Sequence, residues 1–412
     1  MLTRVPTPDG DPGKVPADMS DVEARLARIR GTAPVREHTA RTIAALTTNP
    51  GCDRRAVLDA AGIDKQKLAG YVEFPVPSGQ SPFAISRGNA FEAQVKADGC
   101  AGLLRLLGER LGLPVPEVSY ADLAPAGTGA SLDARHARTR ELLAEAAAAG
   151  PDGGVLLDHP LLRLDVGGRA AYLEPDLIAV RLRGRFHVVE IKSFAVIDGQ
   201  ADGRKVAAAA TQAAVYVLAL RGLLAELGYG PETVADEVVL ICPENFANQP
   251  TAALVDVRRQ LTVLTRQLSR LARIGDLIAT LPADLTFDLG AAGAQPEPGC
   301  GGGEHPPRFS DDSAVPGRPV VEVVGALHAT RARYAPECLD ACELAYFCRD
   351  EARGQTAALG RSVHDELGGV PDVAGVLDLA AGTRVPDPDQ AEAAELLRLA
   401  ARLRAESLAS AL

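Results

Sequence analysis

Several common signatures are absent from this chain of 412 residues, and each absence excludes a class of protein. A Gly-x-x-x-x-Gly-Lys-Ser/Thr phosphate loop is missing, which excludes a P-loop motor within this polypeptide. The Gly-x-Ser-x-Gly elbow of serine hydrolases is missing as well. No uninterrupted apolar run approaches the ~20 residues that span a bilayer, and no signal-like segment is seen. We therefore expect a soluble, cytoplasmic protein with no membrane partner.

An excess of positive charge is also absent, because the formal net charge is -11. Proteins that bind DNA through many phosphate contacts usually carry a basic surface. Arginines nevertheless recur in two expected helices: Arg135, Arg138 and Arg140 beside His136 in one, and Arg258, Arg259, Arg266, Arg270 and Arg273 in the other. They either contact nucleic acid or form solvated faces paired with nearby acids, and the sequence favours neither. We expect weak, salt-sensitive DNA binding unless a partner adds contacts.

Lysine is scarce, with six residues against thirty-seven arginines, so composition alone does not account for the tripeptide Glu190-Ile191-Lys192. This tripeptide ends an expected strand over residues 186–192. An earlier strand is expected to run from residues 170–173 into residues 176–180, with a turn between the two. Side chains alternate across a strand, so Glu190 and Lys192 share one face, and Asp176 is expected beside them on the neighbouring strand.

These residues offer a specific chemistry. Two carboxylates and the carbonyl of Ile191 are hard oxygen ligands that suit Mg²⁺ or Mn²⁺. A lysine near such an ion can orient a water nucleophile and stabilise the charge that grows on a phosphodiester. The alternative is an exposed hairpin in which Glu190 and Lys192 form a surface ion pair worth ~0–1 kcal/mol.

Two expected helices add further candidates. Residues 86–107 predict an amphipathic helix with Glu92 near its first turn. Residues 205–227 predict one long helix, in which Gln212 and Tyr216 lie four residues apart and hence on one face.

Taken in order, Glu92, Pro175-Asp176, Glu190-Ile191-Lys192 and the Gln212/Tyr216 pair resemble the motifs of the PD-(D/E)XK nuclease superfamily, specifically its RecB-like branch. The resemblance implies a restriction-endonuclease-like α/β core with a central mixed sheet flanked by helices. It implies that Glu92, Asp176, Glu190 and the Ile191 carbonyl bind metal. It also implies that Lys192, Asp176 and Glu190 act in catalysis, and that Gln212 and Tyr216 help to hold a nucleic-acid strand. Many members of the family have histidine at the position of Glu92.

The cysteines form a second candidate group. Seven cysteines without a secretion signal favour metal ligands or reduced thiols over a disulfide framework. Cys338, Cys342 and Cys348 form a C-x3-C-x5-C cluster, and their thiolates can converge on one centre. Cys100 and Cys242 are expected in the core, and Cys300 in a Gly/Pro-rich loop without a structural role. The seven histidines show no metal-ligand spacing and are each interpreted as structural, exposed or uninformative.

Cys52, followed by Asp53-Arg54-Arg55, resembles the entry to the core of AddB-like and CRISPR-associated RecB-like nucleases. In those proteins one early and three late cysteines hold a 4Fe-4S cluster. The resemblance therefore implies that Cys52, Cys338, Cys342 and Cys348 hold such a cluster, which joins the two ends of the chain around the core. Four thiolates also suit tetrahedral zinc, and ligand type alone does not separate the two. Unliganded thiols are the third possibility.

The composition along the chain predicts six regions. They are a disordered tail (1–18), a helical N-terminal region with Cys52 (19–80), a nuclease core (83–281) with an inserted helix (131–149), a linker (287–319), a cysteine cluster region (320–355) and a helical C-terminal tail (357–412).

The leading hypothesis is a Mg²⁺- or Mn²⁺-dependent deoxyribonuclease that acts on single strands or duplex ends and carries a structural iron-sulfur cluster. DNA repair or antiviral genome defence is the expected setting, with a helicase or other protein partner supplied in trans. The alternative is an adaptor subunit that keeps the nuclease fold to bind DNA or protein. The acidic net charge and the missing motor favour the adaptor, whereas intact Asp176, Glu190 and Lys192 favour the enzyme. RNA is a weaker third candidate substrate, because nothing in the sequence reads a 2′-hydroxyl.

Overall fold

A computed structural model describes residues 19–76, 82–111, 118–124, 131–149, 154–182, 184–245, 248–290 and 317–410. The tail predicted over residues 1–18, Cys300 and most of the linker predicted over residues 287–319 lie outside the described residues.

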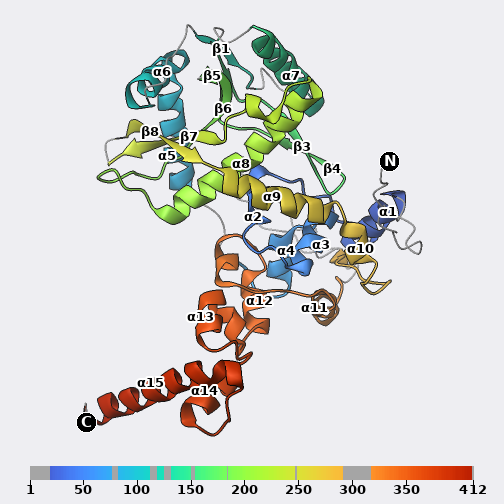
Figure 1. Ribbon diagram of the computed structural model, residues 1–412. Coiled ribbons are helices and arrows are strands. Elements are labelled where there is room, and N and C mark those ends of the chain that lie inside the picture. The colour runs from blue at the N-terminus through green and yellow to red at the C-terminus, as the bar shows by residue number, and fades with distance from the viewer. Residues whose placement is uncertain are drawn as a thin grey trace, which may run out of the picture.

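A six-stranded mixed sheet forms the centre of the larger part of the molecule (Figure 1). Its strands lie in the order β1 (Val118–Asp122), β2 (Gly154–Asp158), β5 (Leu177–Leu182), β6 (Arg185–Ile191), β7 (Glu237–Glu244) and β8 (Gln249–Asp256). β1 pairs with β2 and β6 pairs with β7 in parallel, and the other neighbours are antiparallel. Helices cover both faces, so the predicted α/β class with a central mixed sheet flanked by helices is confirmed.

A separate hairpin of β3 (Leu162–Val166) and β4 (Arg169–Leu173) precedes β5. Its turn is Gly167-Gly168, and both glycines have positive φ, which two-residue hairpin turns favour. The sequence predicted that the strand ending at Leu173 runs on into Asp176. The structure separates them, because β4 pairs only with β3 among the described strands while β5 joins the central sheet.

Side chains along β6 alternate between the two faces of the sheet, and different helices cover each face. Val189 and Ile191 belong to the core on the side of α5 (Pro82–Val95) and α6 (Ala97–Leu111), together with Phe91 and Leu103. Phe186 and Val188 belong to the core on the side of α8 (Gly203–Glu226). Because side chains alternate, Glu190 and Lys192 fall on the α8 side with Val188.

The predicted helix over residues 86–107 is in fact two helices. Asp98, Gly99 and Cys100 all have φ between 53° and 64°, which breaks the helical path just inside the start of α6. The first helix already begins at Pro82. Glu92 therefore lies in the last turn of α5, and the prediction that it lies near a first turn is wrong.

The long helix predicted over residues 205–227 is confirmed as α8, with Asp202 as its N-cap. By length and composition alone α8 could cross a membrane, but 56% of its apolar window is buried inside the molecule. Its buried face carries residues such as Ala213, Val217, Leu220 and Leu224, which join the main core. This is the burial of a helix that packs within the core of the molecule.

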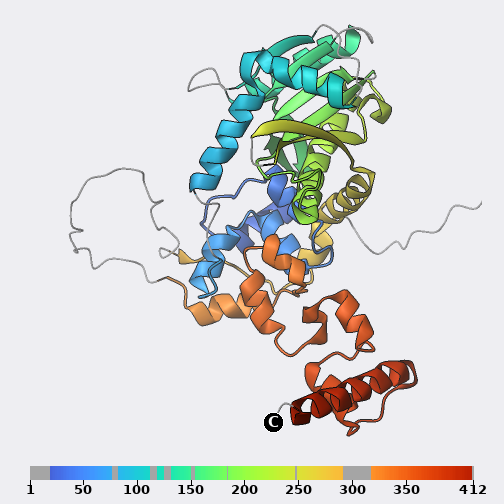
Figure 2. The same cartoon turned by 90° about the vertical axis from the view of Figure 1, so that its left-hand side faces the viewer.

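The remaining helices surround this core and extend below it. They are α1 (Met19–Arg30), α2 (Ala40–Ala45), α3 (Asp53–Ala61), α4 (Lys65–Tyr71), α7 (Leu132–Ala148), α9 (Arg258–Leu271), α10 (Ile274–Ile278), α11 (Val320–His328), α12 (Ala345–Glu351), α13 (Arg361–Glu366), α14 (Val373–Ala381) and α15 (Ala391–Ser410), with the 3-10 helices η1 (Pro231–Thr233), η3 (Pro336–Asp340), η4 (Thr356–Leu359) and η5 (Pro388–Gln390). Residues of α1 to α4 and of α11 share one core with α8. Figures 1 and 2 show α14 and α15 at the end of the molecule far from the sheet, where they pack around a small core of their own.

Candidate active site

The register of β5 and β6 sets Asp176 opposite Glu190. Leu177 pairs with Val189 in antiparallel register, so the next pair toward the end of the sheet is Asp176 with Glu190. The backbone N–H of Ile191 donates a hydrogen bond to Asp176 Oδ2 over 2.7 Å, which holds the carboxylate at this end of β6. Asp176, Glu190 and Lys192 therefore gather at one place, as the strand pattern predicts.

Glu190 is a buried carboxylate that lacks a full set of partners. It is 1% exposed and forms an ion pair with the ammonium of Lys192. Its Oε2 accepts no hydrogen bond from any residue that the structure describes. A buried charged oxygen without a partner costs free energy. A hard divalent cation is a partner that would satisfy it, so these carboxylates fit Mg²⁺ or Mn²⁺.

The pKa values of the three groups reflect burial and their mutual charges. Burial, together with the neighbouring charge of Asp176, raises the pKa of Glu190 to about 8 against the opposing effect of Lys192. Burial also raises the pKa of Asp176, against the opposing effect of Lys192. Burial lowers the pKa of Lys192, but Glu190 and Asp176 outweigh this, so its pKa is raised and the ammonium stays charged. One ammonium thus faces two carboxylates.

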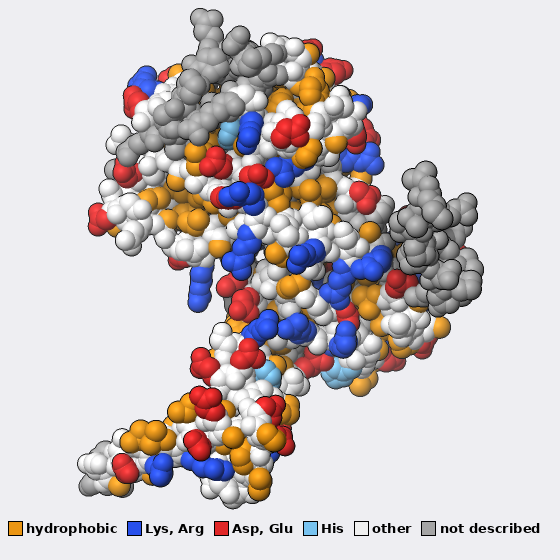
Figure 3. All heavy atoms as spheres, in the orientation of Figure 1, with side chains coloured by type: hydrophobic (Ala, Val, Ile, Leu, Met, Phe, Trp, Pro, Cys, Tyr) orange, Lys and Arg blue, Asp and Glu red, His pale blue; other side chains and the backbone are white. Residues whose placement is uncertain are grey.

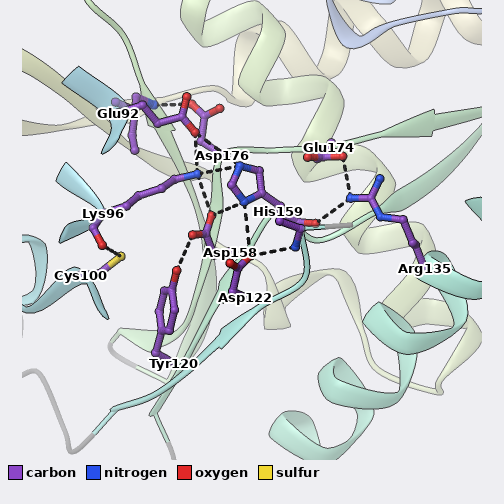
Figure 4. A network of polar contacts seen from close by, with 12 residues as sticks. Glu92, Lys96, Cys100, Tyr120, Asp122, Arg135, Asp158, His159, Glu174 and Asp176 are labelled. Atoms are coloured by element: carbon purple, nitrogen blue, oxygen red, sulfur yellow. Dashed lines mark hydrogen bonds and ion pairs between the residues drawn. The ribbon is translucent and has the colours of Figure 1, made fainter. Parts of the chain in front are cut away.

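Glu92 reaches the same centre from α5. Its charge raises the pKa of both Asp176 and Glu190. Arg87, one turn earlier in α5, donates a hydrogen bond to the carbonyl of Ser193 over 2.8 Å, which holds the helix against the segment that follows Lys192. Glu92 Oε1 lies 2.6 Å from the Nζ of Lys96 (Figure 4).

Beside this centre lies a second polar group that the sequence interpretation missed. Asp122, at the end of β1, and Asp158, at the end of β2, face each other across parallel strands, and His159 follows directly. One ligand atom from each lies within 4.8 Å of the others, so this group could hold a metal ion. His159, which the sequence interpretation takes as structural or exposed, thus stands in a group of possible metal ligands. The available signal was the Asp-His pair at the end of the apolar strand 155–157.

Two of the three arginines of α7 pair with acids. Arg135 lies 2.8 Å from Glu174, in the segment just before Asp176, and Arg138 lies 3.0 Å from Glu141. Figure 4 shows the Arg135 and Glu174 pair beside His159. These contacts favour the paired-face interpretation for Arg135 and Arg138.

Gln212 and Tyr216 meet on α8, as their spacing predicts. The Gln212 amide donates a hydrogen bond to the Tyr216 hydroxyl over 3.2 Å. Tyr216 is 6% exposed, and burial, followed by the charge of Glu190, raises its pKa. Tyr216 therefore faces the carboxylates from inside the molecule, and Gln212 is the more accessible of the two.

The predicted cysteine group brings the beginning and end of the chain together. Cys52 is the N-cap residue of α3. Asn49, just before it, donates from Nδ2 to Cys338 Sγ over 3.1 Å. Burial raises the pKa of Cys348 to about 12 against the opposing charge of Arg54, and the nearby Cys342 and Cys52 contribute to the rise. The four thiols thus gather around the start of α3.

Buried cations surround these thiols. Arg54 is 2% exposed and donates from Nη1 to Cys348 Sγ over 3.2 Å. Burial raises the pKa of Cys342 to about 11, against the opposing charges of Arg55 and Lys65. Positive charge beside sulfur stabilises thiolates. The other two described cysteines, Cys100 and Cys242, are 0% and 2% exposed in apolar clusters, which confirms their prediction as core residues.

No protein-family model matches this chain, and no curated protein matches it. Among solved structures, the chain is similar to an exonuclease candidate from Eubacterium rectale, with 10% identity over 65% of this chain and 88% of that one, at a TM-score of 0.28. It is also similar to the protein SSO0001, with 11% identity over 62% of this chain and 87% of that one, at a TM-score of 0.24. These likenesses are too distant to assign a fold family or an activity.

Proposed function

We propose that this protein is a divalent-metal-dependent nuclease that hydrolyses phosphodiester bonds in DNA. The observation that carries the proposal is the buried carboxylate of Glu190, which has an oxygen without a hydrogen-bond donor among the described residues and stands beside Asp176 and Lys192. A surface ion pair, the alternative for Glu190 and Lys192, would leave both side chains in solvent. Glu190 is instead 1% exposed.

Glu92, Asp176, Glu190 and the carbonyl of Ile191 are the groups that would hold the ion. A bound Mg²⁺ or Mn²⁺ would supply Lewis acidity toward a phosphate oxygen and the attacking water. Lys192 keeps its positive charge at neutral pH and can stabilise negative charge that develops on the phosphate. Tyr216 supports the carboxylates from α8, and Gln212 is the member of that pair with access to a bound strand.

The proposal is tested by incubating the purified protein with linear duplex, circular duplex and single-stranded DNA, each with Mg²⁺, Mn²⁺ or EDTA. We expect cleavage of single strands or duplex ends that requires a metal ion and is lost in Glu190→Gln. Binding of DNA without cleavage under every condition would instead establish the adaptor, which the acidic net charge favours. A matched single-stranded RNA tests the third candidate substrate.

The stability of the metal-free protein is expected to fall as pH rises from about 5 to 8. The pKa of Glu190 rises from 4.5 to about 8 on folding, so the folded state binds the proton more tightly. Its stabilising effect is complete below the unfolded pKa and is lost as pH rises through the folded pKa. The slope is at most about 1.4 kcal/mol per pH unit for one proton. Denaturant unfolding in EDTA measures it, and an equal slope in Glu190→Gln would show that another group is responsible.

We also propose that Cys52, Cys338, Cys342 and Cys348 hold a structural 4Fe-4S cluster. A tetrahedral zinc site with Zn–S bonds of about 2.3 Å needs sulfur atoms about 3.8 Å apart. Among the described residues, a group of three ligand atoms within 4.8 Å of one another comes from Asp122, Asp158 and His159. No three cysteine sulfur atoms of the described residues form such a group. The buried Arg54, which donates to Cys348 Sγ over 3.2 Å, supports an anionic sulfur centre at this place, and tetrahedral zinc is the alternative occupant.

Exposed arginines on α9 are the candidate contacts for the DNA backbone. Lys and Arg side chains form a band across the middle of the face in Figure 3, although the net charge is negative. Arg258 pairs with Asp256 and Arg270 with Asp53, whereas Arg259 and Arg266 are exposed and seven residues apart on one side of α9.

Replacement of both Arg259 and Arg266 by alanine is expected to weaken binding of single-stranded DNA. The slope of log affinity against log salt should decrease by about 0.7 for each phosphate that the variant no longer neutralises. Fluorescence anisotropy at several salt concentrations measures the slope. Arg258→Ala is the matched control, because its guanidinium is already paired with Asp256. A control that loses as much affinity as the double variant would leave α9 without a specific role.

The setting of this activity follows from the same proposal. With no P-loop in the sequence, a helicase or another protein would have to supply unwinding in trans. A cytoplasmic role in DNA repair or genome defence is the setting we propose.

A further inference from the structure

The side chain of Lys96 occupies a central position among the acids of the site. It is 9% exposed, and its Nζ lies 2.6 Å from Glu92 Oε1 and 2.7 Å from Asp158 Oδ1. The same Nζ lies 3.3 Å from His159 Nε2. Figure 4 shows this ammonium surrounded by Glu92, Asp158 and His159, with Asp122 just beyond them.

The group around Lys96 has the composition of a metal site. Asp122, Asp158 and His159 place one ligand atom each within 4.8 Å of one another. Asp158 is 3% exposed, and its Oδ2 accepts a hydrogen bond from Tyr120 over 2.5 Å, which fixes the carboxylate. His159 Nε2 lies 3.7 Å from Glu92 Oε1, so this group adjoins a residue that we assign to the catalytic ion.

We propose that Lys96 is a built-in cation that takes the place of a second divalent ion, so that this centre binds one divalent ion and not two. The inference rests on the proposed function, because it assumes that Glu92, Asp176 and Glu190 hold the first ion. Lys96 is thereby a positioning residue. Lys96 follows Glu92 by four residues and orients its carboxylate. It also keeps Asp158 and His159 from acting as metal ligands.

Contact and charge both support this role. A divalent ion bound to Asp158 Oδ1 would need that oxygen at about 2.0–2.6 Å, in the space that the ammonium fills. The centre contains five carboxylates and two ammonium groups: Glu92, Asp122, Asp158, Asp176 and Glu190, with Lys96 and Lys192. With all five carboxylates ionised, as metal binding requires, three negative charges are uncompensated. One bound divalent ion would leave the centre with a single net negative charge. A second ion would make the net charge positive before a phosphate binds.

The test is the number of Mn²⁺ ions bound to the full chain, measured by electron paramagnetic resonance of free Mn²⁺ during titration. We expect one ion for the wild type and for Lys96→Arg, which keeps the cation. We expect two ions for Lys96→Met, which keeps the length of the side chain and removes the charge. Adding Asp158→Asn to Lys96→Met should return the number to one. Lys96→Gln, which keeps a donor for Asp158, is the second uncharged variant should Lys96→Met fail to fold.

Two ions bound to the wild type, or one ion bound to a folded Lys96→Met or Lys96→Gln, would overturn the inference. No ion bound to the wild type would overturn the proposed function as well, and the two failures are thereby distinguished. Because the readout is binding, it does not depend on knowing which DNA is cleaved.

Discussion

Lys192→Ala is expected to lower kcat for metal-dependent DNA cleavage by about 10²–10³-fold, the usual effect of removing one group that stabilises transition-state charge. The ammonium forms an ion pair with Glu190, and its raised pKa keeps it charged across the neutral range. Without it, Glu190 loses the ammonium that forms its ion pair while it still faces Asp176. Binding of Mn²⁺ should persist, because the carboxylates remain.

The matched control is Lys205→Ala, which removes an exposed lysine in the first turn of α8. It should cleave DNA at the wild-type rate. Circular dichroism and iron content should be the same in both variants. Wild-type cleavage by Lys192→Ala would remove Lys192 from the catalytic group.

The second large effect is expected for Cys342→Ala. This variant should lose its iron and its solubility before it loses any intrinsic nuclease activity. Iron should fall from about four atoms per chain toward none, together with the visible absorbance of the cluster. The thiol lies beside Arg55 and Lys65, whose positive charges would lose the compensation of the proposed anionic cluster. The thermal midpoint should fall as well, because a cluster that joins α3 to the segment after α11 contributes to folding.

Cys242→Ala is the control for this experiment, since it removes a buried thiol from an apolar cluster in β7. Its iron content should equal that of the wild type. Quantification of zinc on the same anaerobic samples separates the two cofactors. A full complement of iron in Cys342→Ala would exclude this residue as a ligand.

The central part of the site could be predicted from the sequence because short-range geometry determines it. Asp176, Glu190 and Lys192 lie on two strands joined by a tight turn, so alternation and register are enough to bring them together. The same holds for Gln212 and Tyr216, whose spacing of four on one helix leads directly to their hydrogen bond.

The rest of the site depends on long-range placement that no local pattern encodes. Lys96 meets His159 across 63 residues, and the contact exists only because β2 inserts beside β5 in the sheet. Glu92 was placed in the wrong turn because the start of α5 at Pro82 was not recognised, although proline is common in the first turn of a helix.

The break after α5 was also missed. Asp98 and Cys100 adopt positive φ, which residues other than glycine seldom do. The apolar pattern continues past both residues and therefore wrongly predicts an unbroken helix. The spacing of Cys338, Cys342 and Cys348 predicts that these three converge, whereas Cys52 joins the group only through the resemblance. Nothing in the spacing of Cys52 and Cys338 predicts that the two lie in one place.

The central claim is that one divalent ion binds between Asp176 and Glu190, next to Lys192. Anomalous scattering at the manganese edge from crystals grown with Mn²⁺ tests it most directly. We predict a single strong peak within coordination distance, about 2.0–2.6 Å, of the carboxylate oxygens of Asp176 and Glu190. No peak at these oxygens, or a peak at Asp122, Asp158 and His159 alone, would contradict it.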